Sequence, residues 1–248
     1  MNPLALLVAA TVPAFALLIS VDPVTPTVVL LATAVALRLS PARPVDLLRR
    51  ARPLLLAATS IGVLNALLSE AGGRLLVDVG PVTVTTGAAV AGASTALRLL
   101  AVALPGLLAV LLIDPVDLAD ALVQQARVPA RPAYGALVAL RLVPLLTEDW
   151  TQLRRARRAR GIAAGSPVGA VRLFAGQVLG LLVQALRRGT RIATAMDARG
   201  FDSTGPRTFA RAAVLTSADR WLVVASVLVT TCAVGLSVAT GAWRPVLG

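Results

Sequence analysis

The tripeptide Ala-Arg-Gly occurs twice in this chain, as Ala159-Arg160-Gly161 and as Ala198-Arg199-Gly200. Each copy follows a segment with the pattern of a basic amphipathic helix. The macrodipole favours Arg in the last turn of a helix, and a Gly directly after it is typical of a left-handed C-terminal cap. The pattern predicts two helix ends, each presenting one guanidinium between small residues. Such a side chain makes forked hydrogen bonds to carboxylates or carbonyls in a groove of another protein.

An alternative interpretation of the basic segments is a helix that lies on anionic lipid. That function needs only scattered Arg and no repeated helix end. Because Ala, Arg and Gly are all common in this chain, a single copy would carry little information. Two copies, 39 residues apart (199 − 160) and both at expected helix ends, favour a protein partner over the lipid surface and over coincidence.

Other residues that could do chemistry are few. Asp114, Asp117 and Asp120 are spaced three apart, as in the divalent-metal clusters of prenyl-transfer enzymes. The same residues suit a helix start, with Asp114 as N-cap and Pro115 at the first helical position. We favour capping, because the sequence has no second acidic cluster to complete a metal site. His is absent and Cys232 is the single cysteine, so we predict no catalytic, cofactor-binding or metal-binding residues.

The elements that must hold the two Arg are predominantly apolar. The chain has 248 residues, of which 57% are hydrophobic, and this excess indicates several membrane spans. We expect an all-α polytopic membrane protein with about five transmembrane helices. The expected spans are residues 4–19, 24–37, 54–68, 84–113 and 221–238. The fourth contains Arg98, which is costly in a span unless it reaches the interface or a partner. Residues 134–146 and 167–186 are apolar but less convincing as spans.

Charge predicts the orientation of the chain in the membrane. Net charge is +12, and all 24 basic residues are Arg, of which fifteen lie between Arg127 and Arg211. This distribution is typical of cytoplasmic loops under the positive-inside rule, so it does not indicate nucleic-acid binding. We expect residues 38–52 inside and the polar loop 69–82 outside. The predicted organisation is N-terminal transmembrane helices at 1–113, a cytoplasmic or interfacial module at 114–220, and a C-terminal transmembrane helix at 221–248.

The residues around the tripeptides resemble a known family. Thr194-Ala195-Met196-Asp197-Ala198-Arg199-Gly200-Phe201 is similar to the second signature of the transmembrane T component of energy-coupling factor (ECF) transporters, which are vitamin and metal-ion importers of the ATP-binding-cassette class. Residues 140–161 resemble the first signature region. Weaker matches are Asn2-Pro3-Leu4, Asp22-Pro23, Ala96-Leu97-Arg98 and residues 117–122. The order and spacing agree along nearly the whole chain. Val24 and Asp197 depart from the usual pattern, in which a basic residue and Glu are common at these positions.

The resemblance implies a non-catalytic scaffold in the plasma membrane of a bacterium. It implies that two long cytoplasmic coupling helices end at the signatures, and that each end docks in a groove on one of two ATPase subunits. The ATPase-docking residues would be Ala159, Arg160, Gly161, Ala198, Arg199 and Gly200. The membrane part and the coupling helices would also cradle a small substrate-binding S component. The substrate itself is set by that other chain.

Two further classes of function fit less well. A membrane-embedded enzyme needs a general base or a metal cluster, and the composition offers neither. A self-sufficient secondary transporter needs polar residues near the membrane midplane and an inverted repeat, and only Asn65 and Arg98 are candidates. A chain without Lys also has no nucleotide-binding loop of the G-x-x-x-x-G-K-[ST] type, so ATP hydrolysis would belong to partner subunits.

Overall fold

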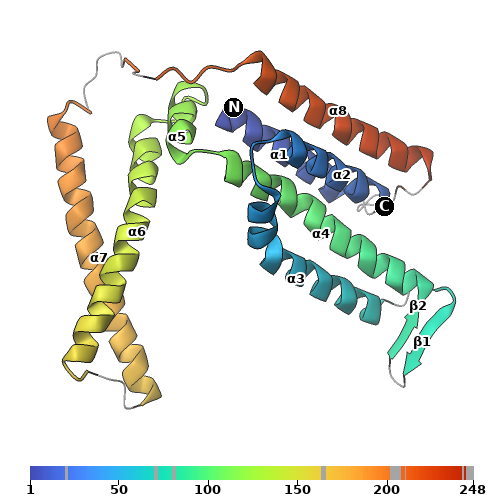
Figure 1. The fold of residues 1–248 in the computed structure, drawn as a ribbon, viewed down its shortest axis with the longest axis horizontal. Coiled ribbons are helices and arrows are strands. Elements are labelled where there is room, and N and C mark those ends of the chain that lie inside the picture. The colour runs from blue at the N-terminus through green and yellow to red at the C-terminus, as the bar shows by residue number, and fades with distance from the viewer. Residues whose placement is uncertain are drawn as a thin grey trace. The chain divides into compact units, whose positions relative to one another are not determined.

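The structure is a computed structural model that describes residues 1–19, 22–69, 72–79, 82–162, 166–201, 208–209, 211–241 and 243 (Figure 1). Over these residues it is helical apart from one short hairpin. The helices are α1 (Pro3–Ile19), α2 (Val24–Leu39), α3 (Pro44–Leu68), α4 (Thr86–Leu112), α5 (Pro115–Gln124), α6 (Ala130–Ala159), α7 (Pro167–Ala198) and α8 (Ser217–Ala239), and the strands are β1 (Leu75–Val79) and β2 (Val82–Thr85). The expected all-α membrane fold is confirmed.

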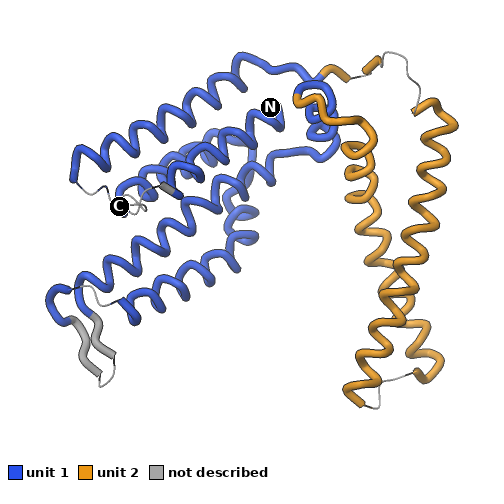
Figure 2. The backbone as a smooth tube through the Cα atoms, turned by 180° about the vertical axis from the view of Figure 1, so that it is seen from behind, with its two compact units in different colours: residues 1–125, 213–248 blue, residues 126–212 orange. Residues whose placement is uncertain are grey.

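The chain divides into two compact units (Figure 2). Unit 1 contains residues 1–125 and 213–248, and unit 2 contains residues 126–212. In unit 1, α4 packs against α1, α2 and α3, while α8 packs against α1 and α2. Small side chains fill most of this core, and Ala88, Ala101 and Ala233 are fully buried. The helices therefore approach one another closely, as is usual for helix packing in membranes.

Helices α3 and α4 approach each other closely where they cross in unit 1. A Cβ atom placed on Gly92 would lie 2.4 Å from the carbonyl oxygen of Gly62 and 2.7 Å from Cβ of Ala66. A Cβ atom on Gly62 would lie 2.9 Å from Cβ of Ala96. Small residues four apart on both helices thus let the two backbones touch, which is the packing mode of small-xxx-small motifs.

Polar contacts fix α1 beside α8 in a parallel arrangement. The backbone N–H of Asn2 donates to Oδ1 of Asp219 at 2.8 Å, and the Ser226 hydroxyl donates to the Ala9 carbonyl at 2.7 Å. Asp219 also forms a capping box with Thr216 at the start of α8. Because α1 and α8 run in the same direction, both begin on the same side of the membrane.

Arg98 lies within α4, and it has a defined partner. Its guanidinium donates to the carbonyl of Leu17 in the last turn of α1. Carbonyls in the last turn of a helix have no partner in their own helix, and the negative end of the dipole favours a cation there. Next to this turn, buried Asp22 accepts hydrogen bonds from the N–H and the hydroxyl of Thr25, each at 2.7 Å. Arg98 and Asp22 are thus both satisfied within unit 1.

The segment expected as an external loop at 69–82 contains strand β1 and the first residue of β2. Strands β1 and β2 pair antiparallel, with Val79 opposite Val82. The hairpin connects α3 and α4, on the side of the membrane opposite to the basic 38–52 segment. The sequence of β2, Val-Thr-Val-Thr, has the β-branched composition typical of a strand.

Four described helices are long and apolar enough to cross a membrane, namely α3, α4, α7 and α8, and α1 and α2 are shorter apolar helices. With 17 residues, α1 reaches the lower end of the spanning range of roughly 17–25 residues. By length and composition, α7 is thus also a candidate membrane span, although residues 167–186 are less convincing from the sequence alone.

Candidate functional site

The first Ala-Arg-Gly copy ends helix α6. Ala159 is the last helical residue, Arg160 is the C-cap, and Gly161 has a positive φ of 71°. The N–H of Gly161 donates to the carbonyl of Arg158 at 3.0 Å, and the N–H of Ile162 donates to that of Arg157 at 3.1 Å. These two bonds define a Schellman motif, in which a left-handed residue closes the helix.

The second copy ends helix α7 in the same way. Arg199 is the C-cap, and Gly200 has a φ of 74°. The N–H of Gly200 donates to the carbonyl of Asp197 at 2.9 Å, and the N–H of Phe201 donates to that of Met196 at 3.1 Å. The backbone angles of the two caps agree closely, with φ −87° and ψ 7° at Arg160 and φ −89° and ψ 11° at Arg199.

Both tripeptides are accessible. All six residues are exposed, and, chain neighbours apart, no heavy atom of the described residues lies within 4 Å of the Cβ position of either glycine. The left-handed glycine caps expected from the sequence are therefore present at both helix ends. Each tripeptide presents one exposed capping Arg between small residues.

Helices α6 and α7 form an antiparallel hairpin within unit 2, and they cross one another in Figure 1. Because the chain reverses between the two helices, the C-terminal end of α6 lies close to the start of α7. The 32 residues of α7 then extend over about 48 Å at a rise of 1.5 Å per residue. The two Arg tips consequently stand at opposite ends of the hairpin, too far apart to enter one groove.

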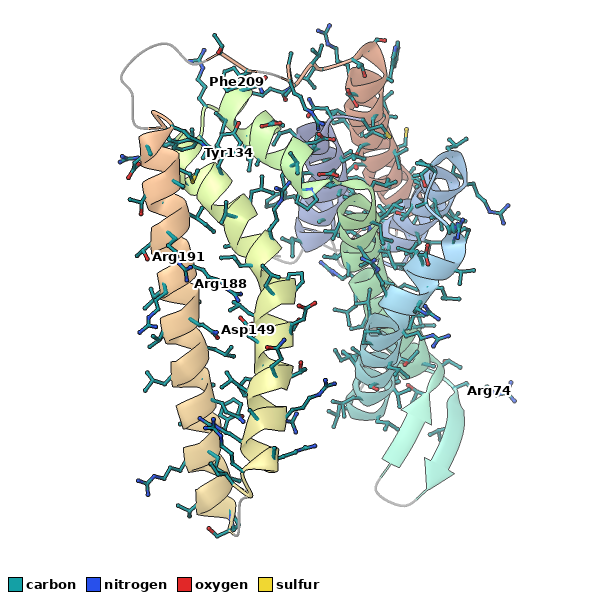
Figure 3. All side chains as sticks on the ribbon, turned by 60° about the vertical axis from the view of Figure 1, so that its left-hand side comes forward. Arg74, Tyr134, Asp149, Arg188, Arg191 and Phe209 are labelled. Carbon is teal, nitrogen blue, oxygen red and sulfur yellow. The ribbon has the colours of Figure 1, made fainter. Side chains whose placement is uncertain are left out.

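An ion pair bridges the two helices. Arg188 of α7 contacts Asp149 of α6 through two separate atoms, with NH1 2.8 Å from Oδ2 and NH2 donating to Oδ1 at 3.3 Å. Figure 3 shows the two side chains pointing toward each other between the helices. The side chain of Asp149 is 13% exposed and that of Arg188 is 30% exposed. The NH2–Oδ1 contact is a hydrogen bond, whereas the NH1–Oδ2 contact is a close ion contact without hydrogen-bond geometry.

Further contacts connect the helices on either side of this ion pair. Trp150 and Phe174 meet edge to face, with ring centroids 5.6 Å apart. Nearer the α6 tip, Arg157 donates to the carbonyl of Leu173 at 2.8 Å. Near the α7 tip, Phe201 packs edge to face on Tyr134, with centroids 5.9 Å apart. Each Arg tip is thus supported by a contact to the other helix.

Few described residues of the hairpin are buried. Helix α7 has no buried residue among those described, and α6 has only Ala133 and Leu137. One side of α7 instead exposes large apolar side chains along the helix. They are Val168, Val171, Phe174, Val178, Leu179, Leu182, Val183 and Leu186. An exposed apolar surface of this extent marks a site that contacts another protein or lipid.

The acidic residues before α6 have a structural explanation. Asp114 is the N-cap of α5, and its side chain accepts a hydrogen bond from the N–H of Val116 at 2.7 Å, with Pro115 following directly. The capping interpretation is confirmed for Asp114. Across the described residues, no group of three or more His, Cys, Asp or Glu side chains is arranged to hold a metal ion.

Comparison with known proteins agrees with this architecture. A sequence profile described as cobalt transport protein (CbiQ) matches residues 1–209. This chain belongs to the CbiQ family. The family resemblance noted from the two signatures is thereby confirmed, and the chain is a multi-pass bacterial membrane protein.

Similar proteins carry the name energy-coupling factor transporter transmembrane protein EcfT. The protein of Thermosediminibacter oceani is 29% identical over 182 residues, which cover 70% of this chain and 68% of the relative. The Bacillus subtilis protein is 25% identical over 191 residues, 73% of this chain and 72% of the relative. The Staphylococcus aureus protein is 27% identical over 146 residues, 55% of this chain and 54% of the relative. The CbiQ-family chain is thus similar to T components of ECF transporters.

Proposed function

We propose that this chain couples two cytoplasmic ATP-binding-cassette ATPase subunits to a substrate-binding S component. The complex would import a vitamin or a metal ion. The observation that carries the proposal is the pair of matching helix ends. Each presents Arg160 or Arg199 on a Schellman cap, and the hairpin between them places the two tips at opposite ends. Two separate helix ends allow each of the two ATPase subunits to bind one end.

The topology supports a cytoplasmic location for unit 2. The basic residues Arg43, Arg49 and Arg50 follow α2, so this end of α2 lies inside by the positive-inside rule. Two spans later, α4 ends on the same side as α2. Helix α8 begins there as well, because it runs parallel to α1. The intervening residues 114–216 therefore lie on the cytoplasmic side, where ATPases have access to them.

The exposed apolar side of α7 provides the second contact of the proposed complex. A helix that carries Arg172, Arg187 and Arg191 as well as this apolar surface suits the boundary between membrane and cytoplasm. We assign this surface to the S component. ATP hydrolysis belongs to the ATPase subunits, and their closure would move the two Arg tips and, through α6 and α7, the S component.

The test is charge reversal at both tips. The R160E/R199E variant is expressed at the wild-type level in the membrane, and the ATPase subunits that co-purify with it are quantified. The control is R74E/R220E, which changes net charge equally on exposed residues of unit 1. We expect loss of the ATPases from the first variant only. If they co-purify with R160E/R199E at the wild-type ratio, the docking role is wrong.

A further inference from the structure

The first turns of α3 expose apolar and basic side chains together. Residues that are three or four apart are neighbours on a helix surface. By this spacing one side of the helix carries Val45, Leu48, Arg49 and Arg52, and all four are exposed. The exposed fractions of the two apolar side chains are 71% and 58%. Apolar groups interleaved with guanidiniums are typical of the boundary between a membrane and water.

The packing of α3 directs this side away from the protein. Leu47 and Ala51, which are four apart, are buried on another side of the same turns. Among the residues that the structure describes, neither Arg49 nor Arg52 forms an ion pair. The segment 38–52 contains five Arg and one Asp, so its net charge is +4. An anion from outside the chain is therefore needed to balance this charge.

These turns lie directly before a membrane span. The apolar run of α3 begins at Leu54, and Pro53 precedes it inside the helix. A proline in a helix interior kinks the helix. Figure 1 shows α3 bending after its first turns. The basic turns thus lie at the membrane surface, and by the positive-inside rule that surface is the cytoplasmic one.

We propose that Arg49 and Arg52 bind the phosphate of an anionic phospholipid in the cytoplasmic leaflet. Guanidinium groups form forked hydrogen bonds with phosphate oxygens, and two Arg residues three apart are close enough to share one phosphate. Val45 and Leu48 contact the glycerol and the upper acyl carbons of the same lipid. The excess of positive charge favours an anionic headgroup over a zwitterionic one. The site involves only unit 1, so it does not depend on the proposed function.

Titration with a lipid tests the site. Phosphatidylglycerol is added to the full chain in detergent, and native mass spectrometry measures the affinity of the most tightly bound lipid. R49Q/R52Q should weaken this affinity about 25-fold, because each Arg at an anionic lipid surface contributes about fivefold. R49K/R52K keeps both charges and should retain most of the affinity. Unchanged affinity of R49Q/R52Q would overturn the proposal.

The matched control is R50Q/R220Q, which removes the same charge from exposed residues of unit 1. Arg50 is rotated about 100° around the helix from Arg49, toward the side that carries Asp46. We expect the control to bind phosphatidylglycerol as tightly as the wild type. Equal weakening by both double variants would indicate general attraction to anionic lipid rather than a site, and would overturn the proposal.

A second measurement keeps all the Arg residues, so it does not depend on how well the variants fold. A photo-crosslinking amino acid replaces Leu48 in the full chain, and the products formed in native membranes are identified by mass spectrometry. We expect a phospholipid with an anionic headgroup, enriched over its share of the membrane lipids. A protein product, or phospholipids in proportion to their abundance, would overturn the proposal.

Discussion

Removing the ion pair between α6 and α7 should loosen the hairpin. The D149N variant keeps the shape of the side chain but removes the charge that Arg188 contacts at 2.8 Å. Hydrogen bonds to charged groups contribute about 1.5–3 kcal/mol, and solvent screening of a pair that is 13% and 30% exposed reduces this to about 1–2 kcal/mol. Because α7 has no buried residue among those described, few other contacts would compensate.

A loss of about 1–2 kcal/mol corresponds to roughly five- to thirtyfold more frequent opening. Hydrogen–deuterium exchange of the protein in lipid nanodiscs measures this opening, peptide by peptide. We expect faster exchange along the middle of α7 in D149N and no change in the helices of unit 1. The double variant D149R/R188D, which restores an ion pair with reversed charges, should regain part of the protection.

The matched control is R191Q, one turn along α7. Arg191 is labelled beside Arg188 in Figure 3, but among the described residues its guanidinium bonds only the Arg187 carbonyl of its own helix, at 3.2 Å. Its replacement should leave the hydrogen exchange of α6 and α7 peptides unchanged. If hydrogen exchange of the α7 peptides in D149N is within twofold of the wild type, the ion pair does not hold α6 and α7 together and this reasoning is refuted.

Three further perturbations test the caps and the packing of unit 1. In Gly161→Ala the new Ala must adopt the left-handed conformation, at a cost of about 1–2 kcal/mol, and ATPase co-purification should fall. Gly180→Ala, in the open interior of α7, is the control and should not reduce it. Equal ATPase recovery from both variants would argue against a role of the cap. Gly92→Ala should lower the unfolding free energy in detergent by about 1–3 kcal/mol, because its Cβ would meet the Gly62 carbonyl at 2.4 Å. Gly106→Ala has open space on the same helix and is its control, so similar melting of the two would contradict the close α3–α4 crossing. Arg98→Leu should destabilise the protein by about 1–3 kcal/mol, because it leaves the Leu17 carbonyl without its partner. Its control, Arg74→Leu in an exposed loop, should be neutral. Thermal unfolding measures both variants, and unchanged stability of Arg98→Leu would show that the bond to α1 is dispensable.

Local signals in the sequence predicted the helix ends well. A Gly that follows Ala-Arg needs no distant residue to form a left-handed cap, and both caps formed as expected. The Asp114-Pro115 helix start is local in the same sense. The apolar runs likewise predicted the helices of unit 1, because the length of a span depends on the bilayer rather than on tertiary contacts.

Contacts between distant residues were not predictable in this way. The Arg-rich segment gave no sign that Arg157 and Arg188 turn inward while their neighbours face outward, since that depends on where α6 and α7 cross. The partner of Arg98 is 81 residues away in sequence. The expected loop at 69–82 contains strand β1, and the alternating Val and Thr of β2 were the available signal for that hairpin.

Native mass spectrometry of the intact purified complex tests the central claim most directly. It counts the ATPase subunits or domains bound to one copy of this chain, for the wild type and for the single variants R160E and R199E. The account predicts two ATPases on the wild type and fewer on each single variant, because each Arg tip holds one of them. A wild-type complex with a single ATPase, or a single variant that keeps both, would contradict it.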